Sequence, residues 1–196
     1  MNDPGSLNHP ALTPAQRQVL LTLARTAIAY GLAHGRPPAI NPARYDPALG
    51  AQGAAFVTLH RAGSLRGCIG HLEAIQPLVK DVADNAFAAA FRDPRFPPLR
   101  EYELDALQIE ISVLTPAIPL EFRSERELMD QIEPGKDGLI LEEGLARGTF
   151  LPSVWESLPE RSDFLAQLKR KAGLPPDYWS DRLKVSRYRT ESFGEA

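Results

Sequence analysis

"AAFVTLH" (residues 54–60) and "LRGCIGH" (residues 65–71) flank the turn-like stretch "RAGS" (residues 61–64). Apolar and polar side chains alternate on both sides of this turn, which predicts two strands joined as a β-hairpin. The only cysteine of the chain, Cys68, lies in the second strand between two glycines. The hairpin is the first strand pair of the chain, and its register decides which side chains face the core.

Helix and strand patterns extend outward from this hairpin. Helices are expected after Thr13-Pro14 as far as Gly35, and from Pro77 to about residue 92, and a strand over 107–113. In the second half we expect a short helix capped by Ser124 and Glu127, a hairpin within 137–152, a helix ending at Gly173 and a final strand over 182–189. The order hairpin, helix, strand thus occurs twice, at 54–114 and 138–189. Strands mixed with helices without regular alternation predict an α+β fold.

The composition fits one globular domain or two interlocked lobes. The chain has 196 residues and a net charge of −3, and we expect residues 1–11 to be a tail and residues 12–193 to form the domain. No apolar run is long enough to span a membrane. The first ten residues lack the pattern of a signal peptide, and a single cysteine forms no internal disulfide, so we expect a cytoplasmic protein.

The environment of Cys68 depends on the length of the hairpin loop. A two-residue loop at Gly63-Ser64 places Cys68 on the core face with Val57, whereas a three-residue loop places it beside His60. We expect the first arrangement, with the thiol directed inward. Two-residue loops that begin with glycine are common, and unpaired cysteines are among the most buried residues.

Two kinds of site are compatible with these residues. In a catalytic site, Cys68 is the nucleophile, Arg66 lowers the pKa of its thiol, and His60 or His71 accepts the proton. In a binding site, Arg66 holds an anionic ligand or a carboxylate of the protein. Gly67 and Gly70 then let a ligand or another backbone approach closely.

Six motifs, taken in order, resemble one known family: GAAFVTLHRAGSLRGCIG, FRDPRFPPL, LQIEISVLTP, KDGLILE, TFLPSVWE and KVSRYR. They resemble the AMMECR-type domain, also called AmmeMemoRadiSam system protein A, over about residues 12–193. The resemblance implies an α+β fold of two β-β-β-α-α-β units, related by a pseudo-dyad and separated by a cleft. It also implies association with a Memo-type protein and a radical SAM protein, but no settled activity.

The resemblance carries over only to residues that match its motifs. These are the hexapeptide at residues 65–70 and the second motif, Asp93 to Phe96, in which Asp93 and Arg95 are candidate ligand-binding residues. Asp93 before proline is also ordinary turn chemistry. His71 lies outside the hexapeptide, which argues against a catalytic pair of Cys68 and His71.

The sequence gives little support for a zinc site, an iron–sulfur cluster or a nucleotide-binding loop. Cys68 and His71 are too few ligands for a zinc site, one cysteine does not hold an iron–sulfur cluster, and nucleotide-binding glycine motifs are absent from the sequence. No cofactor is therefore expected. Residues 169–189 contain seven basic and two acidic residues with interleaved aromatics, a pattern also seen in nucleic-acid-binding surfaces.

The sequence leaves three functions open. The favoured one is an accessory or binding module that holds a small anionic ligand or a partner protein around residues 65–70. The alternatives are an enzyme with Cys68 as its nucleophile, and nucleic-acid binding through residues 169–189. The acidic net charge argues against nucleic-acid binding over the whole protein surface.

Overall fold

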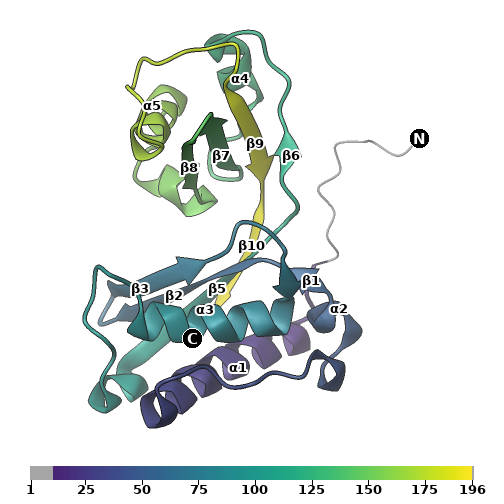
Figure 1. The fold of residues 1–196 in the computed structure, drawn as a ribbon, viewed down its shortest axis with the longest axis vertical. Coiled ribbons are helices and arrows are strands. Elements are labelled where there is room, and N and C mark those ends of the chain that lie inside the picture. Colours follow the sequence, from purple (N-terminus) through teal and green to yellow (C-terminus); the bar gives the residue numbers. More distant parts are fainter. Residues whose placement is uncertain (1–10, 196) are drawn as a thin grey trace. The chain divides into compact units, whose positions relative to one another are not determined.

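The computed structural model describes residues 11–195, which divide into two compact units. One unit contains residues 11–114 and 191–195, and the other contains residues 115–190 (Figure 1). The expected tail lies, apart from Ala11, outside the described residues.

The first unit is a four-stranded sheet with two long helices packed on one face (Figure 1). Its strands run in the order β10-β5-β2-β3, and β2 pairs antiparallel with both β5 and β3. The buried aliphatic side chains of the two helices and of alternate strand residues form one core. Its helices are α1 (Pro14–His34), η1 (Pro42–Arg44), α2 (Pro47–Gly50), α3 (Leu78–Phe91) and η2 (Glu101–Ala106). Its strands are β1 (Gln52–Gly53), β2 (Ala55–Arg61), β3 (Ser64–Gly70), β4 (Gln76–Pro77), β5 (Leu107–Leu114) and β10 (Thr190–Gly194).

The second unit has its own sheet, in the order β6-β9-β7-β8, and its own core. The Trp155 ring stacks on Phe164, with ring centroids 3.7 Å apart, at the centre of that core. The elements are β6 (Ile118–Pro119), α4 (Glu125–Gln131), β7 (Gly138–Glu143), β8 (Ala146–Phe150), η3 (Pro152–Glu156), α5 (Arg161–Lys171) and β9 (Lys184–Tyr188).

The two sheets have corresponding strand orders. In each, a hairpin (β2–β3 or β7–β8) pairs with the strand that follows its helix (β5 or β9). The strand that follows β5 in sequence is β6, which joins the second sheet, and the strand that follows β9 is β10, which joins the first. The α+β class with mainly antiparallel sheets is thus confirmed. The pseudo-dyad and the cleft stay predictions.

Helix ends follow their local sequence signals. Thr13 accepts a hydrogen bond from the Gln16 amide at the start of α1, and Gly35 ends the helix in the left-handed region with φ of 67°. The Ser124 hydroxyl caps α4 by accepting from the Glu127 amide. These ends are predictable because capping uses side chains only three residues away.

The expected register of the first hairpin is wrong. Its loop is Ala62-Gly63, where both residues have positive φ, 50° and 75°, as a tight two-residue turn requires. Arg66 is an extra residue in β3, because His60 pairs with Leu65 whereas Leu59 pairs with Gly67. This bulge shifts the register by one residue and flips all later side chains of β3 to the other face.

Cys68 therefore lies opposite Thr58 and not on the core face with Val57. Its side chain is half-buried. Gly67 takes the core position, opposite Leu59 and against the backbone of Ala89 in α3. The expectation that the thiol points into the core is corrected by the bulge at Arg66.

The strand over 182–189 is also not the last strand, because β10 follows it. The sequence of β10, TESFG, contains only two residues that favour strands, Thr190 and Phe193. Long-range ion pairs also hold β10, and the residue that follows it, to the first unit. Glu191 accepts from Arg17 at 2.8 Å, and Glu195 accepts from Arg25 Nε at 2.8 Å.

Replacing Gly67 with alanine should destabilise the fold. The added Cβ would overlap the carbonyl oxygen of Ala89, and a helix backbone cannot move away as a side chain can. We expect Gly67→Ala to lower the free energy of unfolding by about 2 kcal/mol or more, measured by urea denaturation. The control is Gly63→Asn, at a turn position with open space around it, where a loss of about 0.5 kcal/mol is expected. Equal stability of Gly67→Ala and wild type would contradict the packing described.

Candidate functional site

The two sequence motifs of the first unit meet at the free edge of β3. The Cys68 amide donates to Asp93 Oδ2 at 2.9 Å, and Arg95 donates through Nη2 to the Cys68 carbonyl at 3.3 Å. Arg95 also donates to both carboxylate oxygens of Asp93, through Nε at 3.0 Å and Nη2 at 2.7 Å. β3 is the last strand of its sheet, so these backbone groups have no strand partner on that side. The pair Asp93–Arg95 replaces a neighbouring strand at this position.

Arg66 is held by the protein itself. Its guanidinium donates to both carboxylate oxygens of Glu103, at 2.8 and 3.0 Å, and to the carbonyl of Pro97 at 3.0 Å. Arg66 and Glu103 are both buried. Arg66 Nη1 is also buried but has no hydrogen-bond partner in the described chain. The bidentate pair fixes the bulge of β3 and leaves the Nη1 nitrogen of Arg66 without an acceptor among the described residues.

Both carboxylates of this region are held in the charged form. The hydrogen bond from Arg95 lowers the pKa of Asp93 well below its usual range, and the Cys68 amide adds to this effect. The hydrogen bond from Arg66 lowers the pKa of Glu103 from 4.5 to about 2. In both cases the bonds outweigh the opposing effect of burial. The site is thus a set of fixed charges at neutral pH.

A row of polar side chains crosses the sheet face opposite to α1 and α3. Thr58 lies directly across from Cys68 on one side and from Glu110 on the other, so all three share this face. The Thr58 hydroxyl donates to Cys68 Sγ at 3.3 Å. His60 lies on the same face, two residues along β2, in the row of Leu65 and Gln108. These side chains are the candidate functional site, with Arg95 at its edge.

The candidate bases do not contact the thiol. Within the described residues, no hydrogen bond joins Cys68 Sγ to a histidine. His71 instead binds Asp81, with 2.6 Å between Nδ1 and Oδ1. The structure thus brings Cys68, Asp93 and Arg95 together and places Arg66 beside them with another partner. His71 is not part of this group, because it contacts Asp81.

Two acidic residues of this region were missed in the sequence. Glu103 binds Arg66 and lies in a segment without a clear pattern. Asp81 is fully buried in α3 and also accepts from the Ala55 amide at 2.9 Å and from Asn85 at 3.0 Å. A signal for Asp81 existed, because an acidic residue inside an apolar helix stripe requires buried partners.

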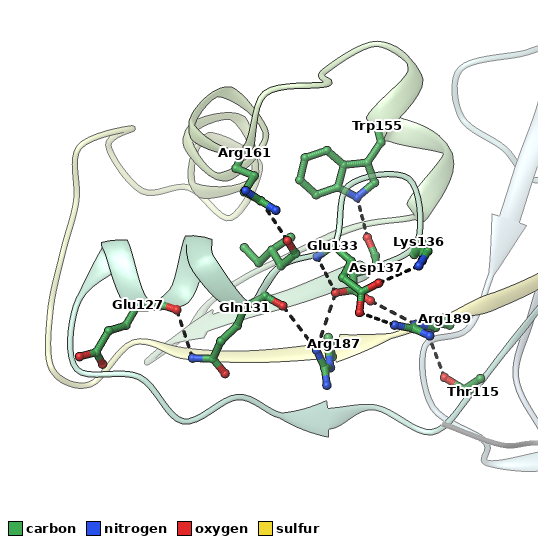
Figure 2. Close-up of polar contacts among 11 residues, drawn as sticks. Thr115, Glu127, Gln131, Glu133, Lys136, Asp137, Trp155, Arg161, Arg187 and Arg189 are labelled. Atoms are coloured by element: carbon green, nitrogen blue, oxygen red, sulfur yellow. Dashed lines mark hydrogen bonds and ion pairs between the residues drawn. The ribbon is translucent and has the colours of Figure 1, made fainter. Parts of the chain in front are cut away.

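The basic stretch 169–189 is largely neutralised by acidic side chains. Arg189 donates to Glu133 at 2.8 Å and to the buried Asp137 at 3.4 Å, and Arg187 also lies near Asp137 (Figure 2). Lys169 is buried and pairs with Glu125 at 2.7 Å, and Arg182 pairs with Glu143 at 3.2 Å. Four of its seven basic residues are thus ion-paired, which leaves little continuous positive surface for a nucleic acid.

Residues 11–195 contain neither a metal-binding cluster nor a helix able to span a membrane. No group of three or more His, Cys, Asp or Glu side chains in this part of the chain is arranged to hold a metal ion. None of its helices has the length and apolar character needed to cross a bilayer.

The fold and motifs define an α+β protein with two four-stranded sheets and one two-stranded sheet, β1-β4. The model of the AMMECR1 family matches residues 21–193, so the chain belongs to the AMMECR1 family. The resemblance drawn from the six motifs is thereby confirmed.

Known relatives cover nearly the whole chain. A protein of Thermococcus gammatolerans is 44% identical over 192 residues, which is 91% of this chain and 89% of the relative. A protein of Methanosarcina acetivorans is 39% identical over 187 residues, 94% of each chain. The crystal structure of the uncharacterized protein PH0010 from Pyrococcus horikoshii matches with a TM-score of 0.83 and 40% identity, over 90% of each chain. The names of these proteins state no activity.

Acid should destabilise the first unit through Asp93 and Glu103. Folding lowers the pKa of both groups, so the unfolded state binds more protons in acid. Their contribution to stability is present above the usual pKa of about 4 and is lost as the pH falls toward about 2. In urea denaturation at a series of pH values, wild type should lose stability over this range.

Glu103→Gln should show a smaller loss across the same range, because one of the two titrating groups is absent. The matched control is Glu101→Gln, at an exposed residue of the same segment. A Glu103→Gln variant whose pH profile has the same slope as wild type would contradict the assigned ion pair.

Proposed function

We propose that this chain is an accessory binding module whose site is the polar sheet face around Cys68 and the exposed edge of Arg95. The ligand is a small anion or an acidic segment of a partner protein. The observation that carries the proposal is the state of Arg95. Asp93 and the Cys68 carbonyl engage its Nε and Nη2, whereas Nη1 makes no hydrogen bond in the described chain and 54% of the side chain is exposed.

The contacts of Arg95 favour a binding role over that of an unconstrained surface side chain. A buried carboxylate holds the guanidinium in one orientation, so little side-chain entropy is lost when an acceptor meets Nη1. Arg95 binds the carbonyl of Cys68, and Cys68 and the Thr58 opposite it are half-buried and offer a thiol and a hydroxyl that donate weakly or accept. An anionic oxygen at Nη1 would gain a charge-assisted hydrogen bond.

The same geometry favours binding over catalysis by the thiol. A nucleophilic cysteine needs a base within hydrogen-bond reach, and the partner of Cys68 is the hydroxyl of Thr58. His71, the nearest histidine in sequence, is engaged by Asp81. Asp93 and Arg95, which bind the Cys68 backbone, pair with each other and hold that backbone in place.

The resemblance to AmmeMemoRadiSam system protein A suggests which partners to test. In this proposal the module serves a modification carried out by a radical SAM protein, together with a Memo-type protein. Acidic surface segments of either protein are the candidates for contact with Arg95. The chain itself has one cysteine, too few to hold the cluster of such an enzyme.

Replacing Arg95 should weaken binding of the anion or partner. We expect Arg95→Gln to reduce by about tenfold the affinity for the Memo-type or radical SAM protein of the same organism, since a lost charge-assisted bond is worth about 1.5 kcal/mol or more. Isothermal titration calorimetry measures this, with inorganic pyrophosphate as a small anionic probe. The control, Arg170→Gln, removes an exposed arginine of the second unit and should leave affinity unchanged.

Thermal unfolding of both variants shows whether Arg95→Gln also loosens the fold. Because Arg95 braces Asp93, a second variant, Thr58→Val, changes the same face and leaves the Asp93–Arg95 pair intact. Unchanged affinity in both Arg95→Gln and Thr58→Val would contradict the proposed site. No measurable binding of any of these partners by wild type would contradict the proposed function.

A further inference from the structure

The second unit contains a groove of about 650 Å³ beside the edge where β6 pairs with β9. Leu183 and Val185 lie at its base and are buried. Phe122 and Trp179 contribute half-buried aromatic rings to it. All the residues that line this groove belong to residues 119–186, so it is complete within the second unit. Its volume lies in the range of small-molecule sites.

The two aromatic side chains are held in fixed positions. Their ring centroids are 5.7 Å apart at an angle of 59°, a tilted contact that aromatic pairs prefer. The buried Lys169 lies 6.0 Å from the centre of the Trp179 ring and is itself paired with Glu125. Both rings also pack against the core of the second unit. The position of the two aromatic rings in the groove is therefore set before any ligand arrives.

Four charged side chains at the groove have no partner among residues 11–195. Glu121 and Asp181 are acidic, Arg123 and Lys184 are basic, and all four are exposed. None of their side chains makes a hydrogen bond or ion pair with another described residue. By contrast, the other charged residue of the lining, Glu142, is paired with Arg147 at 3.2 Å. The groove thus combines an apolar base with two free charges of each sign.

We propose that this groove binds a small zwitterion with an aromatic body, such as an aromatic amino acid or a short peptide that contains one. The ring packs against Phe122 and Trp179, the ammonium group meets Glu121 or Asp181, and the carboxylate meets Arg123 or Lys184. Equal numbers of free acids and bases give no net attraction for a polyanion, which argues against a nucleic acid here. This site lies in a different unit from Cys68 and does not depend on the function proposed above.

Tryptophan fluorescence gives a direct test, because the chain has only two tryptophans. Trp155 is buried and stacked on Phe164, far from solvent, whereas Trp179 lines the groove. The indole is excited at a wavelength that phenylalanine does not absorb. Under these conditions we expect added L-phenylalanine to cause a saturable change in indole emission. The change should be absent in Trp179→Phe, in which only Trp155 reports.

The analogues phenethylamine and 3-phenylpropionate test the two charges separately, since each lacks one of them. Each should bind about tenfold more weakly than L-phenylalanine, in proportion to one lost ionic contact. The double variant Glu121→Gln/Asp181→Asn should weaken phenylalanine and phenethylamine but not phenylpropionate. The double variant Arg123→Gln/Lys184→Gln should weaken phenylalanine and phenylpropionate but not phenethylamine, and Arg170→Gln is the control for a general charge effect.

The proposal is overturned by any of three results. The first is no saturable change with phenylalanine in the millimolar range. The second is the same change in Trp179→Phe as in wild type. The third is an affinity for phenylalanine that neither charge variant alters. All the charge variants concern exposed residues, so the last comparison holds even if Trp179→Phe fails to fold.

Discussion

The first unit depends on one hydrogen bond, from the backbone amide of Cys68 to the carboxylate of Asp93. β3 is an edge strand, and its outer amide and carbonyl at Cys68 would otherwise face solvent or another strand. Asp93 accepts the amide and Arg95 donates to the carbonyl, so the turn that follows α3 closes the edge of the sheet. The hexapeptide and the second motif are thus two halves of a single contact.

The contacts around this hydrogen bond give the charged residues of both motifs other roles than those expected from the sequence. Arg66 and Glu103 form a buried pair at the bulge of β3, and removing either partner would leave an uncompensated buried charge. Gly67 is required because α3 packs against its backbone. Arg95 combines both roles, since one side of its guanidinium braces Asp93 and the other side is open. The residues most available for recognition are therefore Arg95, Cys68 and Thr58, and not Arg66.

The sequence predicts those parts of the structure that are decided locally. Helix starts at Thr13 and Ser124 and the stop at Gly35 follow from neighbours within a turn, and the α+β class follows from periodicity. The face of Cys68 was not predictable, because the bulge at Arg66 is held by Glu103, 37 residues away. The strand β10 was missed for the same reason, since carboxylates in it and directly after it bind arginines of α1 across 170 or more positions.

Hydrogen exchange at the Cys68 amide tests the central contact most directly. In wild type this amide should exchange as slowly as the paired amides of β2, although β3 has no strand on that side. In Asp93→Ala it should exchange at least about tenfold faster, while the amides between β2 and β5 keep their protection. A Cys68 amide that exchanges rapidly in wild type, or at the same slow rate in Asp93→Ala, would contradict the account.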